Sequence, residues 1–422
     1  MSTPEISQAL HRLLDSPGEV AREEGDTETA LRQATRRIEA TYDVPYLAHA
    51  TIEPMNCTAD VRSDSCEIWA PTQNPQGTQA AAAELTGLPI ERVTVHVTYL
   101  GCGWGRRSNT DFVRDAAETS MRVGAPVQVV WSREEDMRHD FYRPTACHRL
   151  EGGLDADGRL SGLTVRIACT PISAGGGGGG QGVDHNSVDG VANLPYAIPN
   201  LFVDYCRPEI AVPTGYWRSV GASQNTFILE SFLDELAHTA GRDPVEFRLS
   251  MLGHRPRLAH VLRLAAEQSG WGTPLEGRAR GVAVVENKGG LVAEVAEVSL
   301  EHERIRVHRV TCAADCGQII HPGIAEAQMM GSIVCGLTAA LYGEITLDNG
   351  RVVQSNFDDY RLLRFDEMPE VAVHLVKSRE EPGGVGEPAV PPIAPAVTNA
   401  LFALTGRRMR RLPIYAEGRR LT

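Results

Sequence analysis

Residues 382–395 read PGGVGEPAVPPIAP, and this stretch decides how the rest of the chain is interpreted. Its three glycines allow positive φ angles and let the backbone come close to a ligand. Its prolines fix φ and remove hydrogen-bond donors. Glu387, the only charged residue here, is a candidate for partial desolvation, which makes a carboxylate a stronger general base. The alternative is that Glu387 caps the helix that begins near Pro395, or faces water.

The composition is that of a folded protein with ample core. The chain has 422 residues, 42% of them hydrophobic and 23% charged, which is enough for two or three domains. A net charge of −13 argues against nucleic acid or an anionic membrane as the main partner. No run approaches the ~18 apolar residues of a spanning helix, and the first residues do not resemble a secretory signal.

The cysteine pattern favours reduced thiols. Nine cysteines are scattered along the chain, as suits a cytoplasmic protein. Cys312 and Cys316 are spaced CxxxC, but no second pair stands nearby to complete a zinc or iron–sulfur site. We interpret them as core or loop residues, and we expect no metal site built from protein side chains.

The periodicity of apolar residues predicts an α+β fold with mixed sheets. Residues 5–40 are predicted to be helical, and short strands and turns begin at Thr41. Asp348-Asn349-Gly350 predicts a hairpin turn, and Asn74 is placed to cap a helix. The predicted strands lie at about 58–62, 66–70, 92–99, 126–133, 145–170, 281–286, 292–300, 304–311 and 370–377, and the predicted helices at about 75–86, from 110, after 216, 259–269, 324–342 and 395–405.

A second glycine-rich turn lies in LGCGWGRR, where Gly101, Gly103 and Gly105 precede a helix. Backbone N–H groups in such a loop can converge on an anion. Arg106 and Arg107 add positive charge beside it. A tight turn without any ligand is the alternative, because a GxGxG run alone is weakly specific.

A third turn, around Trp217 and Arg218, also exposes its backbone before a strongly amphipathic helix. Gly215 and Gly221 flank it. The run AGGGGGGQG at 174–182 is different, because six consecutive glycines form no element. We interpret it as a linker or loop tip, native or replacing a longer insert, with no phosphate-binding role.

Six motifs in order resemble the large subunit of the molybdenum hydroxylases, the xanthine oxidase family, and most of all the branch that contains the beta subunit of isoquinoline 1-oxidoreductase. The resemblance runs from about Tyr42 to Ile414. The motifs are PYLAHATIEPMNCTA, WAPTQNPQ, LGCGWGRR, GYWRSVGASQNTFILESFLDELA, DCGQIIHPGIAEAQMMGSIVCGLTAALYGEI and GGVGEPAVPPIAPAVTNALFALTG.

This resemblance implies a molybdopterin cofactor, commonly its cytosine dinucleotide, whose dithiolene holds the molybdenum without protein ligands. Glu387 matches the family's general base, which takes a proton from a metal-bound hydroxyl group. The cofactor-binding residues implied are Gly101, Gly103, Trp104, Gly105, Trp217, Arg218, Ser219 and Gly386, and Ser108, Tyr216 and Val220 line the substrate side. Substrates in the family are N-heteroaromatic rings or aldehydes, and electrons leave through a small [2Fe-2S] subunit.

The departures from the family pattern define the alternatives. Members of this branch are nearly twice as long, and their first half carries a glycine–glutamine motif with no counterpart here. Cys102 stands where glycine is usual. These departures leave three explanations: one half of a split large subunit whose front half a separate chain supplies, a truncated subunit with a shortened loop, or a relic that no longer holds molybdenum. In the last case the chain is a cofactor-free fragment or scaffold that keeps the fold. A thiol enzyme using Cys316 or Cys102 is a third hypothesis, without a fixed base beside either residue.

We predict three parts along the chain. Residues 1–40 form an N-terminal helical segment, and residues 41–255 form a first molybdopterin-binding-like subdomain. Residues 256–422 form a second subdomain of the same kind, which carries the Glu387 loop.

Overall fold

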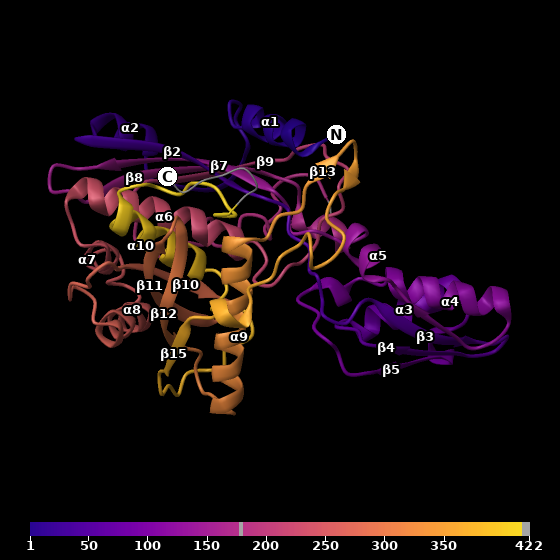
Figure 1. The fold of residues 1–422 in the computed structure, drawn as a ribbon. Helices are drawn as coiled ribbons and strands as arrows, with labels where there is room; N and C mark the ends of the chain where they lie inside the picture. Colours follow the sequence, from indigo (N-terminus) through magenta and orange to yellow (C-terminus); the bar gives the residue numbers. More distant parts are fainter. Residues whose placement is uncertain (177–179, 416–422) are drawn as a thin grey trace.

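The computed structural model describes residues 1–176 and 180–415, and its fold is the α+β arrangement of mixed sheets that the sequence predicts. Figure 1 shows a large body beside a smaller lobe. The predicted glycine loop falls partly on residues 177–179, outside the described residues, and the glycines before them end a short 3-10 turn, η3 (Ile172–Gly176).

Two sheets make up the large body. One has the order β1-β9-β8-β7-β2 (Glu19–Glu24, Leu201–Cys206, Leu160–Cys169, Ala146–Leu154, Arg36–Val44) and only β8 and β9 run parallel. The other has the order β10-β11-β12-β15 (Ala279–Asn287, Gly290–Glu301, Arg304–Asp315, Glu370–Leu375), with β12 and β15 parallel.

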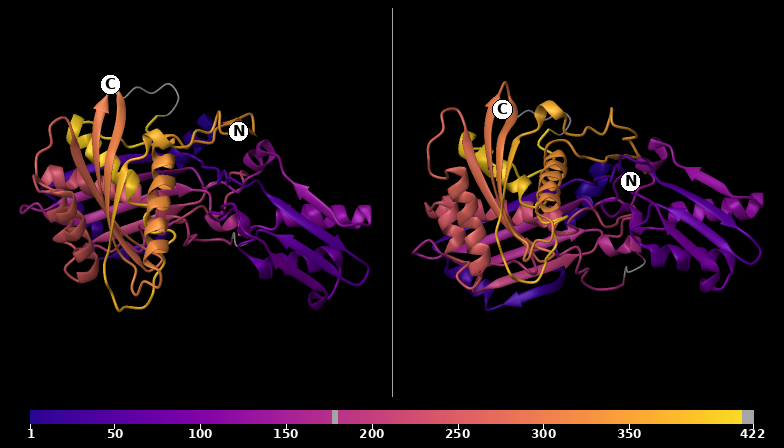
Figure 2. Two further views of the ribbon diagram at one scale, coloured as in Figure 1. Left: turned by 60° about the horizontal axis from the view of Figure 1, so that its bottom comes forward. Right: turned by 90° about the horizontal axis from the view of Figure 1, so that it is seen from below.

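The smaller lobe is a sheet with helices packed on it. Its order is β5-β4-β3-β6 (Val93–Val97, Cys66–Ala70, Asn56–Val61, Val127–Val130), and α3 (Pro75–Thr86) and α4 (Asp111–Val123) complete it. The α3 helix has its predicted bounds, and Asn74 Oδ1 accepts the Gly77 amide over 3.0 Å as the expected N-cap. Figure 2 shows this lobe standing apart from the large body in both views.

The helical prediction for residues 5–40 is wrong in part. Helices α1 (Thr3–Leu13) and α2 (Thr27–Gln33) form, but 19–24 is strand β1 and 36–40 belongs to β2. Both strands pair with later ones, β1 with β9 and β2 with β7. The polar sequence of β1 carries little apolar periodicity, so pairing with β9 decides its structure. In β2, Ile38, Ala40, Tyr42 and Val44 alternate with polar residues, a strand pattern that the helical interpretation overlooked.

Helix α6 (Ala222–Ala240) lies between the two large sheets and is buried over nearly its whole length. Its Glu230 accepts hydrogen bonds from the Tyr196 hydroxyl over 2.6 Å, from Arg248 Nε over 2.8 Å and from the Val284 amide over 3.0 Å. These donors come from a loop, from α7 (Pro244–Leu249) and from β10. One buried carboxylate therefore ties the first sheet's helix to the second sheet.

Helices α8 (Pro256–Ser269) and α10 (Ile393–Thr405) pack on the second sheet, which explains why β11 is apolar and buried on both faces. A Cβ on Gly281 of β10 would lie 2.1 Å from the Ala400 amide nitrogen, so only glycine lets α10 pack this closely. The predicted hairpin also forms, as β13 (Leu347–Asp348) and β14 (Arg351–Val352).

Helix α9 (Pro322–Leu341) has the length and apolar composition of a membrane-spanning segment. It packs on β15 and α10, however, and 44% of its most apolar window is buried inside the protein. Packing in the protein core therefore accounts for the buried part of this window. The short helix α5 (Arg133–Arg138) follows β6.

We expect Arg248→Met to lower the free energy of unfolding by about 3–5 kcal/mol, because it leaves the buried Glu230 carboxylate without its charged partner. Arg278→Met is the matched control. It removes a pair with Glu297 in which the Arg278 side chain is 42% exposed, so it should cost at most about 1 kcal/mol. Urea unfolding measures both, and equal costs would contradict the role given to Glu230.

The buried His148 of β7 should make stability fall in acid. Its Nε2–H donates to Asn225 Oδ1 over 2.8 Å, because the Asn225 amide group already donates to the carbonyls of Ser187 and Asp189. Burial lowers the pKa of His148 to about 4. The unfolded chain takes up this proton below a pH of about 6.5, so unfolding should become easier by up to about 3 kcal/mol as the pH falls from about 6.5 to 4.

Thermal unfolding from pH 7 to 4 measures this effect. His148→Gln keeps an N–H donor without the titration and should flatten the pH dependence by about one proton, whereas the exposed His139→Gln should leave it unchanged. An unaltered slope in His148→Gln would show that other groups dominate.

Candidate active site

The turn before α6 meets the residues around Glu387. Arg218 Nε donates to the Gly386 carbonyl over 2.7 Å. The Ser219 hydroxyl donates to the Glu387 carbonyl over 2.7 Å, and the Ser219 amide lies 3.4 Å from Glu387 Oε1. Segments 168 residues apart in the chain thus form one constellation.

The backbone of this turn is strained and firmly held. Ser219 and Val220 have φ angles of 74° and 52°, a region that costs non-glycine residues of order 1–3 kcal/mol. The Trp217 indole N–H donates to the Ala48 carbonyl over 3.3 Å, and its ring packs on Leu47 and Val390. The surrounding contacts therefore fix a conformation that the turn would not adopt alone.

Glu387 does not cap α10, which begins at Ile393 with Pro392 as its N-cap residue. It is half-buried. The preceding Gly386 carbonyl also accepts the Ser332 hydroxyl of α9 over 3.2 Å, and Arg218 reaches Gln328 Oε1 on α9 over 3.2 Å. The main chain on each side of Glu387 is therefore fixed, while its carboxylate has only the Ser219 amide as a donor among the described residues.

The glycine loop at 101–105 is only partly free to bind an anion. The Gly101 amide donates to Glu53 Oε2 over 2.8 Å, and the Gly105 amide donates to Gln73 Oε1 over 3.1 Å. The expected convergence of these two amides on a ligand is therefore wrong, because protein side chains already bind them. In the part of the chain that the structure describes, the amides of Gly103 and Trp104 donate to no protein group.

Arg106 and Arg107 do not offer charge to a ligand, contrary to the sequence-based expectation. Both side chains are buried. Arg106 makes a two-point pair with Asp111 over 2.9 and 2.7 Å. Arg107 donates to Glu53 Oε2 over 2.9 Å and to the Cys102 carbonyl over 2.8 Å. They are structural supports of the glycine loop.

The two turns contact each other at Gly105 and Tyr216. A Cβ on Gly105, whose φ is +114°, would lie 1.7 Å from the Tyr216 carbonyl oxygen. That oxygen also lies 2.7 Å from His49 Nε2, and His49 Nδ1 lies 2.8 Å from the buried Asp140. Both ring nitrogens of His49 therefore face acceptors.

Sequence reasoning missed these supporting residues. His49 and Glu53 lie in the quoted motif PYLAHATIEPMNCTA and Gln73 lies in WAPTQNPQ, which is the only signal that marks them. Asp140 carries none. Burial by itself raises the pKa of Asp140, but the His49 and Arg106 charges outweigh it and hold the pKa below its ordinary value.

The thiol hypothesis gains no support from the geometry. Burial raises the pKa of the Cys316 thiol to about 11, so the reactive thiolate is disfavoured. The structure also brings together a group of potential metal ligands that the sequence analysis did not predict. His11, Asp43 and Cys147, far apart in sequence, come together in space.

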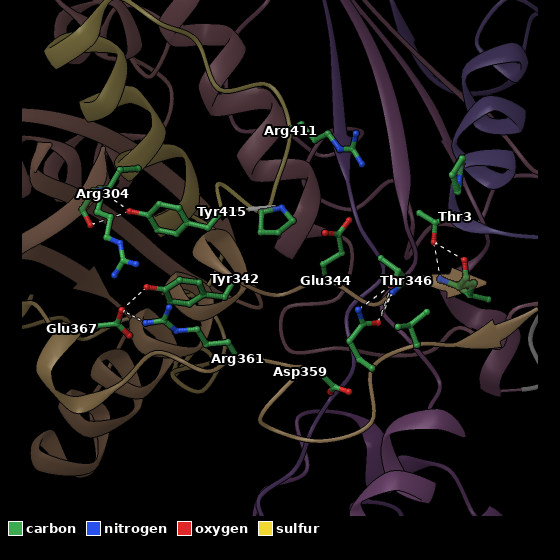
Figure 3. Close-up of a pocket in the computed structure, with 16 residues that line it drawn as sticks. Thr3, Arg304, Tyr342, Glu344, Thr346, Asp359, Arg361, Glu367, Arg411 and Tyr415 are labelled. Atoms are coloured by element: carbon green, nitrogen blue, oxygen red, sulfur yellow. Dashed lines mark hydrogen bonds and ion pairs between the residues drawn. The ribbon is translucent and has the colours of Figure 1, made fainter. Parts of the chain in front are cut away.

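A cavity of about 930 Å³ is lined by Thr3 and Tyr415, among others, and not by Glu387. Figure 3 shows Glu367 facing Tyr342 and Arg361 at one side of it. The Tyr342 hydroxyl donates to Glu367 Oε1 over 2.6 Å, and Arg361 pairs with the same carboxylate. Since the Glu367 carboxylate is already paired, the Glu387 constellation, and not this cavity, is our candidate active site.

Comparisons with known proteins agree on one family. Residues 12–252 match a family model described as a molybdopterin cofactor-binding domain, and residues 263–369 match a second model of that description. The chain is 33% identical over 378 residues to the beta subunit of isoquinoline 1-oxidoreductase from Brevundimonas diminuta, covering 86% of this chain and 48% of the relative.

A subunit of nicotinate dehydrogenase from Pseudomonas putida is 29% identical over 454 residues, covering 98% of this chain and 37% of the relative. The chain thus spans about half or less of the length of these curated relatives. Among solved structures, aldehyde oxidoreductase from Desulfovibrio gigas shares the fold with a TM-score of 0.78 at 16% identity, covering 94% of this chain and 62% of that one.

Gly105→Ala should disturb the contact between Gly105 and the Tyr216 carbonyl that joins the two turns. A control, Gly124→Ala, also has a positive φ of 69° but has open space around its Cβ position, so it should cost only the left-handed strain of about 1–2 kcal/mol. Gly105→Ala should cost a further ~1–3 kcal/mol, because the Tyr216 carbonyl must move. Thermal unfolding and hydrogen exchange of residues 101–105 measure this, and equal effects of the two substitutions would contradict the contact.

Proposed function

The chain belongs to the molybdopterin cofactor-binding family of the molybdenum hydroxylases, and from that premise we propose that it is a component of a hydroxylase large subunit. The proposed reaction replaces a ring or aldehyde C–H by C–OH. Its oxygen comes from water, and two electrons and two protons leave for each turnover. The proposed substrates are N-heteroaromatic rings or aldehydes.

The observation that carries this proposal is the position of the Glu387 carboxylate. Hydrogen bonds from the Arg218 and Ser219 side chains to the Gly386 and Glu387 carbonyls hold the main chain beside it, while the Glu387 carboxylate keeps acceptor capacity. A carboxylate held in this way can take a proton from water at a fixed place. General bases of this kind contribute about 10²–10⁴-fold to a rate.

The residues fit the cofactor in one specific respect. When bound, the cofactor supplies the two-electron redox centre. The amides of Gly103 and Trp104, which have no acceptor among the described residues, are suited to its oxygens or phosphates. Trp104 has a φ of 52°, and a bend of this kind in the backbone can direct successive N–H groups at one anion. Gly101 and Gly105 support that loop, and Trp217, Arg218, Ser219 and Gly386 form the wall around the base. We propose the cytosine dinucleotide form on family resemblance.

The proposed partners are a small [2Fe-2S] subunit, which accepts the electrons, and a separate chain that supplies the front half of the family subunit. Exposed apolar side chains support a protein partner, such as Tyr99 and Ile320, which are 101% and 80% exposed. All nine cysteines are free, as suits the cytoplasmic assembly we propose.

We expect Glu387→Gln to leave folding and molybdenum content intact and to lower hydroxylation by about 10²–10⁴-fold in the complete assembly. The matched control is Glu381→Gln, an exposed glutamate in the same loop, which should keep full activity. The measurements are turnover with an N-heteroaromatic or aldehyde substrate and metal analysis of the purified complex. Substantial turnover by Glu387→Gln would show that another group is the base.

The competing function, a cofactor-free scaffold, is favoured by the two loop amides that protein side chains occupy. The same metal analysis separates the two functions. Absence of molybdenum and pterin from the complex purified with its neighbouring chains would support the scaffold and contradict the hydroxylase.

A further inference from the structure

Three potential metal ligands converge beneath α1, on the face of the five-stranded sheet that this helix covers. His11 Nε2 lies 2.9 Å from Asp43 Oδ1 and 3.5 Å from Cys147 Sγ. All three ligand atoms lie within 4.8 Å of one another. We propose that these residues bind a zinc-class cation, which fixes α1 to the sheet.

The arrangement suits a bound metal ion and not a catalytic relay. In a Cys–His–Asp relay the thiol and the carboxylate contact different nitrogens of the imidazole. Here both contact the same Nε2. One nitrogen, one oxygen and one sulfur therefore point at a common centre.

The fold fixes the three positions independently of a metal. Asp43 of β2 and Cys147 of β7 are direct cross-strand partners, so their side chains leave the sheet on one face. Ile6 and Leu10 of α1 pack in the same apolar cluster as Cys147, and this places His11 above the pair. Cys147 is buried, whereas the His11 side chain is 42% exposed, which gives a cation a route in from solvent.

The spacing and the ligand types suit zinc. Bond lengths of about 2.0–2.3 Å give tetrahedral ligand–ligand distances of about 3.4–3.6 Å. The His11–Cys147 distance of 3.5 Å already matches this spacing. The His11–Asp43 distance of 2.9 Å is that of a hydrogen bond, so it would widen by about 0.5 Å on binding. Thiolate and imidazole select zinc over magnesium or calcium.

The charges of the ligands and their access to solvent also suit a divalent cation. A thiolate and a carboxylate balance a divalent cation once the thiol proton leaves to solvent and the imidazole carries its proton on Nδ1. Arg149, a nearby basic side chain, is held by the Leu14 carbonyl and by Asp15. Water is the usual fourth ligand of a three-residue zinc site, and the His11 side chain, 42% exposed, gives it access from solvent.

The consequence is a stabilised α1. This helix has only 11 residues, a length at which an isolated helix is marginal in water. A ligand that binds only the folded state adds stability in proportion to the logarithm of its concentration. The cation would therefore slow local opening of residues 3–13.

The test is zinc binding by the full chain after chelator treatment, measured by competition against a chromophoric chelator. We expect one equivalent of zinc. His11→Ala and Asp43→Asn should each weaken binding by at least about 100-fold, the upper range for loss of even an outer-shell partner. His96→Ala is the matched control, because His96 pairs with Glu67 over 3.1 Å on the surface without a thiol.

Two further measurements test whether the metal binds at these three residues. Cobalt should give a thiolate charge-transfer band that disappears in Cys147→Ser, and zinc should slow hydrogen exchange of residues 3–13 in the unsubstituted chain. His11 is half-exposed, so His11→Ala should fold normally even if Cys147→Ser does not. Binding that His11→Ala leaves unchanged, or no zinc bound above the level of a control protein, would overturn the proposal.

Discussion

The hydrogen bonds from Arg218 and Ser219 to the main chain at Gly386 and Glu387 are the constraint on which this structure depends. The turn that donates them cannot move freely, because α6 begins directly after it and is buried between two sheets. Glu230 within α6 anchors the helix to β10. A chain of rigid contacts therefore runs from the core to a single half-buried carboxylate. The general-base role that we propose for Glu387 requires a scaffold that fixes a loop carboxylate in this way.

The glycines near this carboxylate are required by protein packing as much as by any ligand. Gly105 lies against the Tyr216 carbonyl, and Gly101 lies against Glu53. Their loop is a folded structure with buried arginine supports, and it leaves the Gly103 and Trp104 amides for an external acceptor. The site's rigidity comes from this chain, and the redox chemistry of the proposed reaction comes from the cofactor that the family binds.

Local signals predicted most of the fold. Helix α3, its Asn74 cap and the hairpin at Asn349 follow from short-range rules that hold whatever the tertiary context. Strand β1 was missed because its polar sequence becomes a strand only by pairing with β9. For the site, Glu387 and the three turns follow from their composition, but the burial of Arg106 and Arg107 does not. Neither the His49–Asp140 pair nor the meeting of His11 with Cys147 leaves a local pattern, because distant segments create both.

The most direct measurement is anomalous diffraction at the molybdenum absorption edge from crystals of this chain with its partner chains. The account predicts a molybdenum peak facing the Glu387 carboxylate, with the Gly103 and Trp104 amides directed at the organic part of the cofactor. A peak elsewhere in the assembly, or a Glu387 side chain turned toward solvent away from the metal, would contradict it.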